Sequence, residues 1–253
     1  MANQLVGRRA IELISECLQD PEFTFYCLID SVACAEQLSE HLSATGQTIK
    51  VLLEVGVEGG RAGCRSESQA QELADAITRI ENITLCGVEF YEGMLANPGP
   101  ERIADFVDNV VTLTGKLYQK GYFEEHFPII SGAGSAWYDI VAEVFSRRNQ
   151  PSWFIPVIRP GCYVTHDQGI YQHAQDLIDV RNQYAVSNQP SLISCLEVWA
   201  YVLSVPEPGK AIVGLGKRNC AYDAGLPKAV KWLPQPHKES GSKSVCSIDA
   251  IHT

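Results

Sequence analysis

Short apolar runs alternate with amphipathic stretches through the first 160 residues of the chain. Residues 4–19 carry apolar side chains at helical spacing, which predicts a helix that ends before Asp20-Pro21. Asp30-Ser31, after an apolar and aromatic run, is typical of a helix N-cap. Continued along the chain, the pattern predicts strands at 23–30, 49–56, 83–93, 127–134 and 152–161, and helices at 31–46, 66–80, 100–120 and 135–148.

Near-continuous apolar strands separated by helices favour a parallel sheet covered by helices, in an α/β fold that is either a barrel or a doubly wound sheet. After Pro160 the pattern changes, because residues 191–205 and 211–216 flank the turn "PEPGK" and predict an antiparallel hairpin. From Lys228 the chain is polar with little periodicity. We therefore expect an α/β part at 1–160, part of a β domain at 161–227, and a loosely ordered tail at 228–253.

Composition and charge narrow the class of partner. The 253 residues are 45% apolar and 20% charged, which is typical of a soluble globular protein. A net charge of −10 and a pI near 5.1 favour a small-molecule partner over nucleic acid or an anionic membrane. No apolar run reaches the ~20 residues that span a bilayer, and the N-terminus lacks a signal peptide's apolar core, so we expect a cytoplasmic protein. The nine cysteines form no CxxC pair and are expected to be reduced and mostly buried.

Glycine-bearing loops follow the predicted strands at the carboxyl edge, where parallel α/β folds gather their chemistry. Arg61 lies in "GVEGGRAGCR", where a flexible loop with a surface cation is the simpler interpretation. Tyr91 ends a strand and could merely pack on its neighbours. "SGAGS" (131–135) precedes a predicted helix and could bind an anion at its N–H groups, or Ser135 could be a plain N-cap. "RPGCY" (159–163) follows the last strand.

Five stretches in this order resemble one group of pyridoxal phosphate enzymes. They are "EVGVEGGRAGCR", "GVEFYEG", "ISGAGSAWYD", "VIRPGCYVTHDQGIY" and "AIVGLGKRNCAYDAGLP". Residues 2–228 resemble the family of D-threonine aldolase, D-serine dehydratase and amino acid deaminase. The resemblance implies a partial (β/α)8 TIM-type barrel of alanine-racemase type, followed by part of a β domain, with pyridoxal 5′-phosphate as an electron sink at the substrate α-carbon.

The resemblance also implies roles for individual residues. Arg61 would lie near the phenolic side of the cofactor's pyridine ring, and Tyr91 near the ring itself. The residues implied around the cofactor phosphate are Ser131, Gly132, Gly134, Gly161 and Tyr163. His166 and Asp167 follow this last loop and are expected to be structural.

The chain departs from the family at its lysines and at its C-terminus. Relatives form a Schiff base through a lysine at the end of the first barrel strand, whereas the first lysine here, Lys50, opens a strand at the opposite end. The other lysines fall on a predicted helix, beside the hairpin or in the tail: Lys116, Lys120, Lys210, Lys217, Lys228, Lys231, Lys238 and Lys243. The spacing of His237, Cys246, Asp249 and His252 does not reproduce the family's metal motif, so we expect no metal site. With five strands of eight, the chain resembles an internal piece of the family that begins inside a helix with no strand before it.

Two classes of function follow. The first is a pyridoxal phosphate-dependent lyase, deaminase or aldolase for D- or β-hydroxy amino acids, truncated, without its own catalytic lysine and inactive alone. The second is a non-catalytic cofactor-binding or interaction protein. Loss of an upstream coding segment is a third interpretation, and open sheet edges would then favour self-association. The expected partners are a small-molecule amino acid and either a second copy of the chain or a complementary segment.

Overall fold

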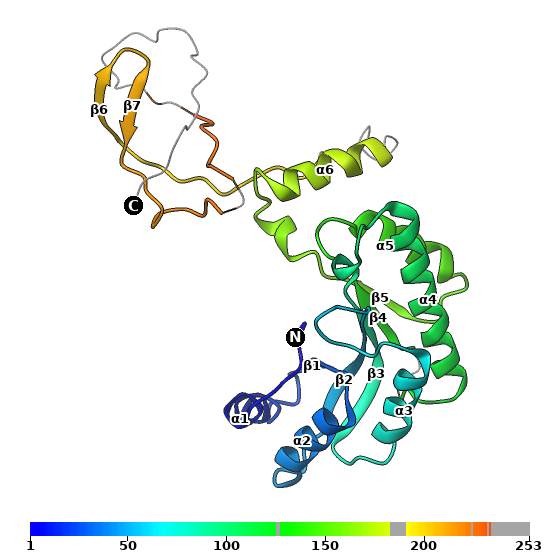
Figure 1. The fold of residues 1–253 in the computed structure, drawn as a ribbon. Coiled ribbons are helices and arrows are strands. Elements are labelled where there is room, and N and C mark those ends of the chain that lie inside the picture. The colour runs from blue at the N-terminus through cyan, green and yellow to red at the C-terminus, as the bar shows by residue number, and fades with distance from the viewer. Residues whose placement is uncertain (125–126, 183–190, 224, 232, 234–253) are drawn as a thin grey trace. The chain divides into compact units, whose positions relative to one another are not determined.

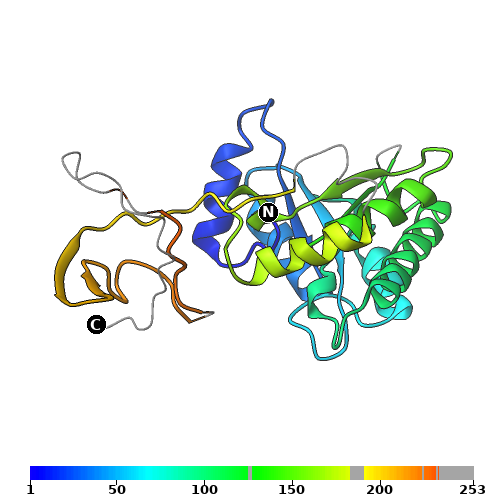
Figure 2. The same cartoon turned by 90° about the horizontal axis from the view of Figure 1, so that it is seen from above.

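The computed structural model describes residues 1–124, 127–182, 191–223, 225–231 and 233 (Figures 1 and 2). The chain forms two compact units, Met1–Gly161 and Cys162–Thr253. The first unit contains the parallel sheet and the helices that cover it. The second contains one longer helix and a small antiparallel sheet.

The first unit is built on one parallel sheet of five strands in the order β1-β2-β3-β4-β5 (Figure 1). Each strand pairs with the next strand along the chain, as where Leu52 lies opposite Leu28 on one side and Gly87 on the other. A doubly wound sheet reverses its strand order partway, so this unbroken order is that of a barrel segment. The strands are β1 (Tyr26–Ile29), β2 (Ile49–Val55), β3 (Ile83–Phe90), β4 (Ile129–Gly132) and β5 (Ile155–Ile158), and they confirm the predicted α/β class.

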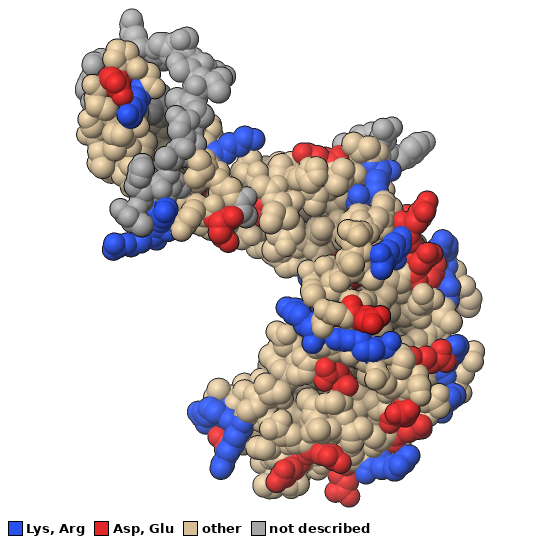
Figure 3. Space-filling model, in the orientation of Figure 1, with Lys and Arg blue, Asp and Glu red and all other residues tan. Residues whose placement is uncertain are grey.

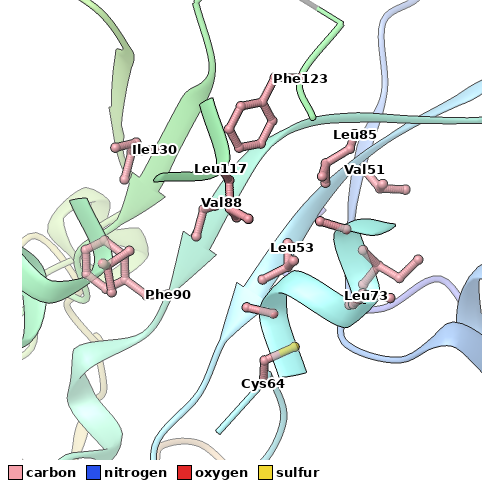
Figure 4. Close-up of a cluster of buried hydrophobic side chains, with 14 of the residues drawn as sticks. Val51, Leu53, Cys64, Leu73, Leu85, Val88, Phe90, Leu117, Phe123 and Ile130 are labelled. Carbon is pink, nitrogen blue, oxygen red and sulfur yellow. The ribbon is translucent and has the colours of Figure 1, made fainter. Parts of the chain in front are cut away.

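Helices cover one face of this sheet. They are α1 (Arg8–Cys17), α2 (Val32–Ser43), α3 (Glu67–Ile77), α4 (Pro100–Gln119) and α5 (Tyr138–Arg148). Ser31 and Ser66 cap α2 and α3 by accepting the backbone N–H groups of Cys34 and Gln69, and each such cap is worth about 1 kcal/mol. Alternate side chains of the strands, Val51, Leu53, Val88 and Phe90 among them, pack between sheet and helices with Leu73 and Leu117 (Figure 4).

The opposite face of the sheet is layered. Leu28, Leu52, Cys86 and Ile129, from four neighbouring strands, form a small buried apolar cluster there. The next layer toward the carboxyl ends is polar, because the register aligns Glu54 with Glu89 and Glu89 with Ser131. Because successive side chains of a strand point to opposite faces of the sheet, these polar groups lie on the same face, at the carboxyl ends of the strands.

The start of the chain corrects one expectation. The N–H of Leu28 donates to the carbonyl of Asn3 at 3.1 Å, and Gln4 forms a parallel bridge with Leu28. Helix α1 begins only at Arg8. The prediction that the chain starts inside a helix is therefore wrong, because residues 3–4 run alongside β1 as a short extended segment, although β1 remains the first strand of the described residues.

The second unit holds α6 (Ile170–Arg181), β6 (Val202–Glu207) and β7 (Lys210–Val213). The two strands pair antiparallel, which confirms the hairpin, but residues 191–201 are not part of it. Helix α6 was not predicted. Asp167 Oδ1 accepts the N–H groups of Gly169 and Tyr171 at its start, which is a local signal for a helix. The predicted tail lies outside the described residues from 234 onward.

Surface and cysteine expectations have mixed outcomes. Only Cys27, Cys64 and Cys86 of the eight described cysteines are buried, so the prediction of mostly buried thiols is wrong. Burial raises the pKa of Cys27 to about 12 and that of Cys64 to about 11, which leaves both thiols protonated.

Within the described part of the chain, no helix is long and apolar enough to cross a membrane. On the face in Figure 3, basic and acidic side chains are interspersed.

Candidate functional site

Arg159 lies at the centre of the polar edge of the sheet. It follows β5, and its backbone N–H donates to the carbonyl of Gly132 at 3.0 Å. Its guanidinium donates through Nε to Ser131 Oγ at 2.8 Å and through Nη2 to a carboxylate oxygen of Glu89. Burial lowers the pKa of Arg159, and the negative charge of Glu54 acts in the opposite direction. A largely buried cation is thus held in place by residues of three strands.

Glu54 is the second ionisable group at this edge. It lies at the end of β2, is half-buried, and its Oε2 accepts a hydrogen bond from Gln4 Nε2. Burial raises its pKa, whereas the hydrogen bond from Gln4 and the charges of Arg61 and Arg159 lower it. The negative charge of Glu54 therefore offsets the positive charges of Arg61 and Arg159.

The loop that follows β2 is held by its own side chains. Arg65 donates to the carbonyls of Gly60, Ala62 and Gly63, and the N–H of Gly63 donates to Asp30 Oδ2 at 3.1 Å. These hydrogen bonds hold the guanidinium of Arg65 within the loop. Arg61 projects from the same loop and lies over the ring of Tyr91, 5.7 Å from its centroid.

The structure brings Arg61 and Tyr91 together, whereas their placement beside a cofactor ring stays a prediction. Between them and Glu54 lies a hollow of about 10 Å³, which is room for about one water molecule. Gly56, Gly60 and Met94 also line it. This hollow is too small to hold a cofactor ring.

The conformation of the loop after β4 is restricted by three consecutive residues around the end of β3, namely Phe90, Tyr91 and Glu92. A side chain at Gly132 would overlap the ring of Phe90, and a Cβ at Gly134 would lie 2.8 Å from Cε2 of Tyr91. Between the two glycines Ala133 has a φ of +70°, in the left-handed region. The N–H of Gly134 donates to Oε1 of Glu92 at 2.6 Å. Side chains larger than hydrogen are therefore excluded at both glycines.

Ser135 is not the cap of the helix that follows. Helix α5 begins at Tyr138, its N-cap residue is Trp137, and no side chain caps it. The interpretation of Ser135 as a plain N-cap is therefore wrong. The loop between β4 and α5 is longer than predicted, because residues 135–137 form a turn before the helix starts.

The remaining predicted residues belong to the end of the first unit and to the second unit. Gly161 ends the first unit, and a side chain there would meet no atom within 4 Å. Tyr163 belongs to the second unit and is 52% exposed. His166 is buried in that unit with a φ of +47°, and Asp167 caps α6 as described.

Two carboxylates of the site, Glu89 and Glu92, were not predicted from the sequence. Glu89 and Glu92 are 2% and 0% exposed, and in each an Oε2 atom lacks a hydrogen-bond partner among the described residues. The available signal was the motif "GVEFYEG", in which two glutamates interrupt a strand end that is otherwise apolar and aromatic. A charged residue inside a fully buried strand is rare unless it is paired.

The lysines of the first unit lie away from this edge. Lys50 is near the amino end of β2, with its ammonium 5.6 Å from the ring centroid of Tyr26, and four residues of strand, about 13 Å, separate it from Glu54. Lys116 binds Glu67 on the helical layer. Among the described residues no group of three metal-ligating side chains gathers, and His237, Cys246, Asp249 and His252 lie outside them.

Comparisons with known proteins agree with the fold described above. Residues 11–163 match the family described as "Alanine racemase, N-terminal domain". The structure is similar to D-threonine aldolase from Filomicrobium marinum, with a TM-score of 0.64 and 22% identity over 89% of this chain and 56% of that one. It is also similar to AQ1208 from Aquifex aeolicus, with a TM-score of 0.50 and 16% identity over 64% of this chain and 40% of that one.

A third structure, D-threo-3-hydroxyaspartate dehydratase from Delftia sp. HT23, has a TM-score of 0.48 and 18% identity over 66% of this chain and 42% of that one. No curated protein matches the chain in sequence. The chain spans about half the length of the aldolase. Because the family match covers more than half of the chain and the sheet has the order of a barrel segment, the chain belongs to the alanine racemase N-terminal domain family.

Proposed function

We propose that this chain binds pyridoxal 5′-phosphate at the carboxyl edge of its sheet, as part of a lyase, deaminase or aldolase site for D- or β-hydroxy amino acids. The observation that carries the proposal is the continuous band formed by Arg61, Tyr91 and Gly134, which joins two loops that the resemblance assigns to the cofactor. When bound, this cofactor withdraws electrons from the α-carbon of an amino acid.

The residues present fit the anionic parts of the cofactor. Arg61 is exposed and offers a cation beside an aromatic ring. The glycines of the loop after β4 allow a ligand to approach the backbone closely. Tyr91 is 38% exposed and offers a flat surface on which a pyridine ring can stack. These residues bind and orient; none of them supplies the amine that covalent attachment requires.

The placement of the lysines favours a second candidate, which is cofactor binding without turnover. In the described part of the first unit, Lys50 is at the opposite end of its strand and Lys116 is paired on the outer layer. A catalytic lysine would then come from another segment or another chain. The two candidates share the same binding site and differ in chemistry.

Titration of the 253-residue chain with pyridoxal 5′-phosphate and with pyridoxal tests the shared site. We expect the phosphate-bearing compound to bind at least tenfold more tightly. Arg61→Gln should weaken its binding by about tenfold, as for a lost hydrogen bond to a charged group. Arg79→Gln, an exposed arginine at the end of α3, is the matched control and should leave binding unchanged. Equal affinity for both compounds would reject the phosphate site.

Borohydride reduction separates the two candidates. After incubation with pyridoxal 5′-phosphate, reduction followed by mass spectrometry should show no cofactor attached to a lysine of this chain. Assays with D-serine and D-threonine should show no turnover. A stoichiometric adduct on Lys50 or any other lysine, together with turnover, would establish a complete enzyme instead.

A further inference from the structure

Glu92 is fully buried, yet it carries a carboxyl group that the proposed mechanism does not use. It lies in the short 3-10 helix η1 (Glu92–Met94), directly after the strand end that carries Tyr91. Its Oε1 accepts the N–H of Gly134 at 2.6 Å, and its Oε2 has no hydrogen-bond partner among the described residues. An orphaned oxygen in a buried carboxyl group is costly unless the group is neutral or gains a ligand.

The contact with Gly134 falls in the loop that the resemblance assigns to the cofactor phosphate. An anion at such a loop would be expected to take the N–H groups that precede helix α5. In the structure a side chain of the same protein already binds one of them. Phosphate recognition by this loop therefore depends on Glu92, either as a support or as a competitor.

The surroundings of Glu92 favour a support. Burial raises the pKa of Glu92, and backbone hydrogen bonds from Glu92 itself, Gly134 and Ala133 offset this only in part. A neutral carboxylic acid still accepts the Gly134 N–H through its carbonyl oxygen. The upward shift of the pKa of Glu92 reduces the negative charge beside an incoming phosphate, which an ionised carboxylate would repel.

The geometry of the loop shows what this support fixes. Ala133 is in a left-handed conformation that costs a residue with a side chain roughly 1 kcal/mol or more. Gly134 passes close to the ring of Tyr91 and to Oε1 of Glu92. The hydrogen bond from the Gly134 N–H to Glu92 offsets part of this strain, so its loss should allow the loop to relax.

We propose that Glu92 is a positioning residue that accepts the Gly134 N–H and thereby holds the loop 131–135 in the conformation that receives a phosphate group. This inference rests on the proposed cofactor site and adds to it a residue that touches the loop and not the ligand. It predicts that shape and hydrogen-bond acceptance matter at position 92, and that charge does not.

Three variants test this inference, through the ratio of affinities for pyridoxal 5′-phosphate and pyridoxal. Glu92→Gln keeps the acceptor and removes the charge, so it should keep the ratio within about twofold. Glu92→Ala removes the acceptor and should lower the ratio about tenfold, which corresponds to one lost hydrogen bond. Glu101→Gln, an exposed glutamate in the first turn of α4, is the matched control. Circular dichroism and thermal melts establish that each variant is folded.

Each outcome bears on the inference. A ratio that Glu92→Ala leaves unchanged would overturn it, as would a Gln variant that loses as much as the Ala variant. A Gln variant that binds the phosphate compound more than tenfold more tightly would also overturn it, because Glu92 would then be a competing anion. If the unmodified chain does not distinguish the two compounds, the cofactor site itself fails, which is distinct from a failure of the role of Glu92.

Discussion

The two faces of the five-stranded sheet use the same strands in different ways. On the helix-covered face, Val51, Leu53 and Phe90 contribute only hydrocarbon to the main core. On the other face, Leu52 is followed by Glu54 two residues later, so the apolar layer gives way to carboxyl groups at the carboxyl end. Residues that stabilise the fold and residues that carry polar chemistry therefore alternate along the same strands, and they do not occupy separate segments of the chain.

The largest effect is expected on the helix-covered face. Phe90 is completely buried and its ring meets those of Phe106 and Phe145 at centroid distances of 5.6 and 6.1 Å. Phe90→Ala should lower the free energy of unfolding by about 3–5 kcal/mol, measured by urea denaturation. Phe23→Ala, at a ring that is 38% exposed, is the control and should cost about 1 kcal/mol or less. Equal losses would contradict the assignment of the core to this face.

A somewhat smaller loss is expected for the buried ion pair on the other face. Arg159→Met leaves Glu89 buried without its cation and should cost about 3 kcal/mol. The double variant with Glu89→Leu should recover much of this loss, because neither buried charge then remains. Denaturation of the two single variants and the double variant forms the cycle. Additive losses would show that the pair is not energetically coupled.

The pH dependence of stability reports on Glu92. Because burial raises its pKa in the folded state, protonated Glu92 favours folding, and this contribution is complete in acid and is lost as the pH rises through the raised pKa. Glu92→Gln should therefore match the wild type near pH 4 and be more stable than the wild type near pH 8. Thermal melts across this range check it. A constant difference at all pH values would mean that Glu92 does not titrate as inferred.

The fold was predictable from the sequence where local pattern and burial agree. The strand containing Leu53 and the cap at Ser31 were found because apolar runs and capping residues mark them directly. Helix α6 was missed although half of its twelve residues are apolar, because the chain after Pro160 was assigned to a β domain; only Gln175 and Ile178 of the helix are buried. The extended segment at Gln4 was missed because one parallel bridge leaves no periodic pattern.

The candidate site was only partly predictable. Motifs identified Arg61 and Tyr91, which are in contact in the structure. They did not identify Glu89 or Glu92, since the value of a buried carboxyl group depends on which backbone or cation it meets across strands. Spacing along the chain carries no such information, because the partners of these two residues are 42 and 70 positions away.

The smallest effect is expected for an ion pair on the helical layer, and it completes the contrast with Arg159. Lys116 lies 2.7 Å from Glu67, with side chains 50% and 55% exposed, whereas Glu89 is almost completely buried. Water and salt screen the exposed pair, so Lys116→Gln should change the free energy of unfolding by less than about 1 kcal/mol, and less still in 1 M salt. Denaturation at low and high salt measures it. A loss as large as that of Arg159→Met would mean that burial does not separate the two pairs, because the same ionic contact would then be worth as much in water as inside the sheet.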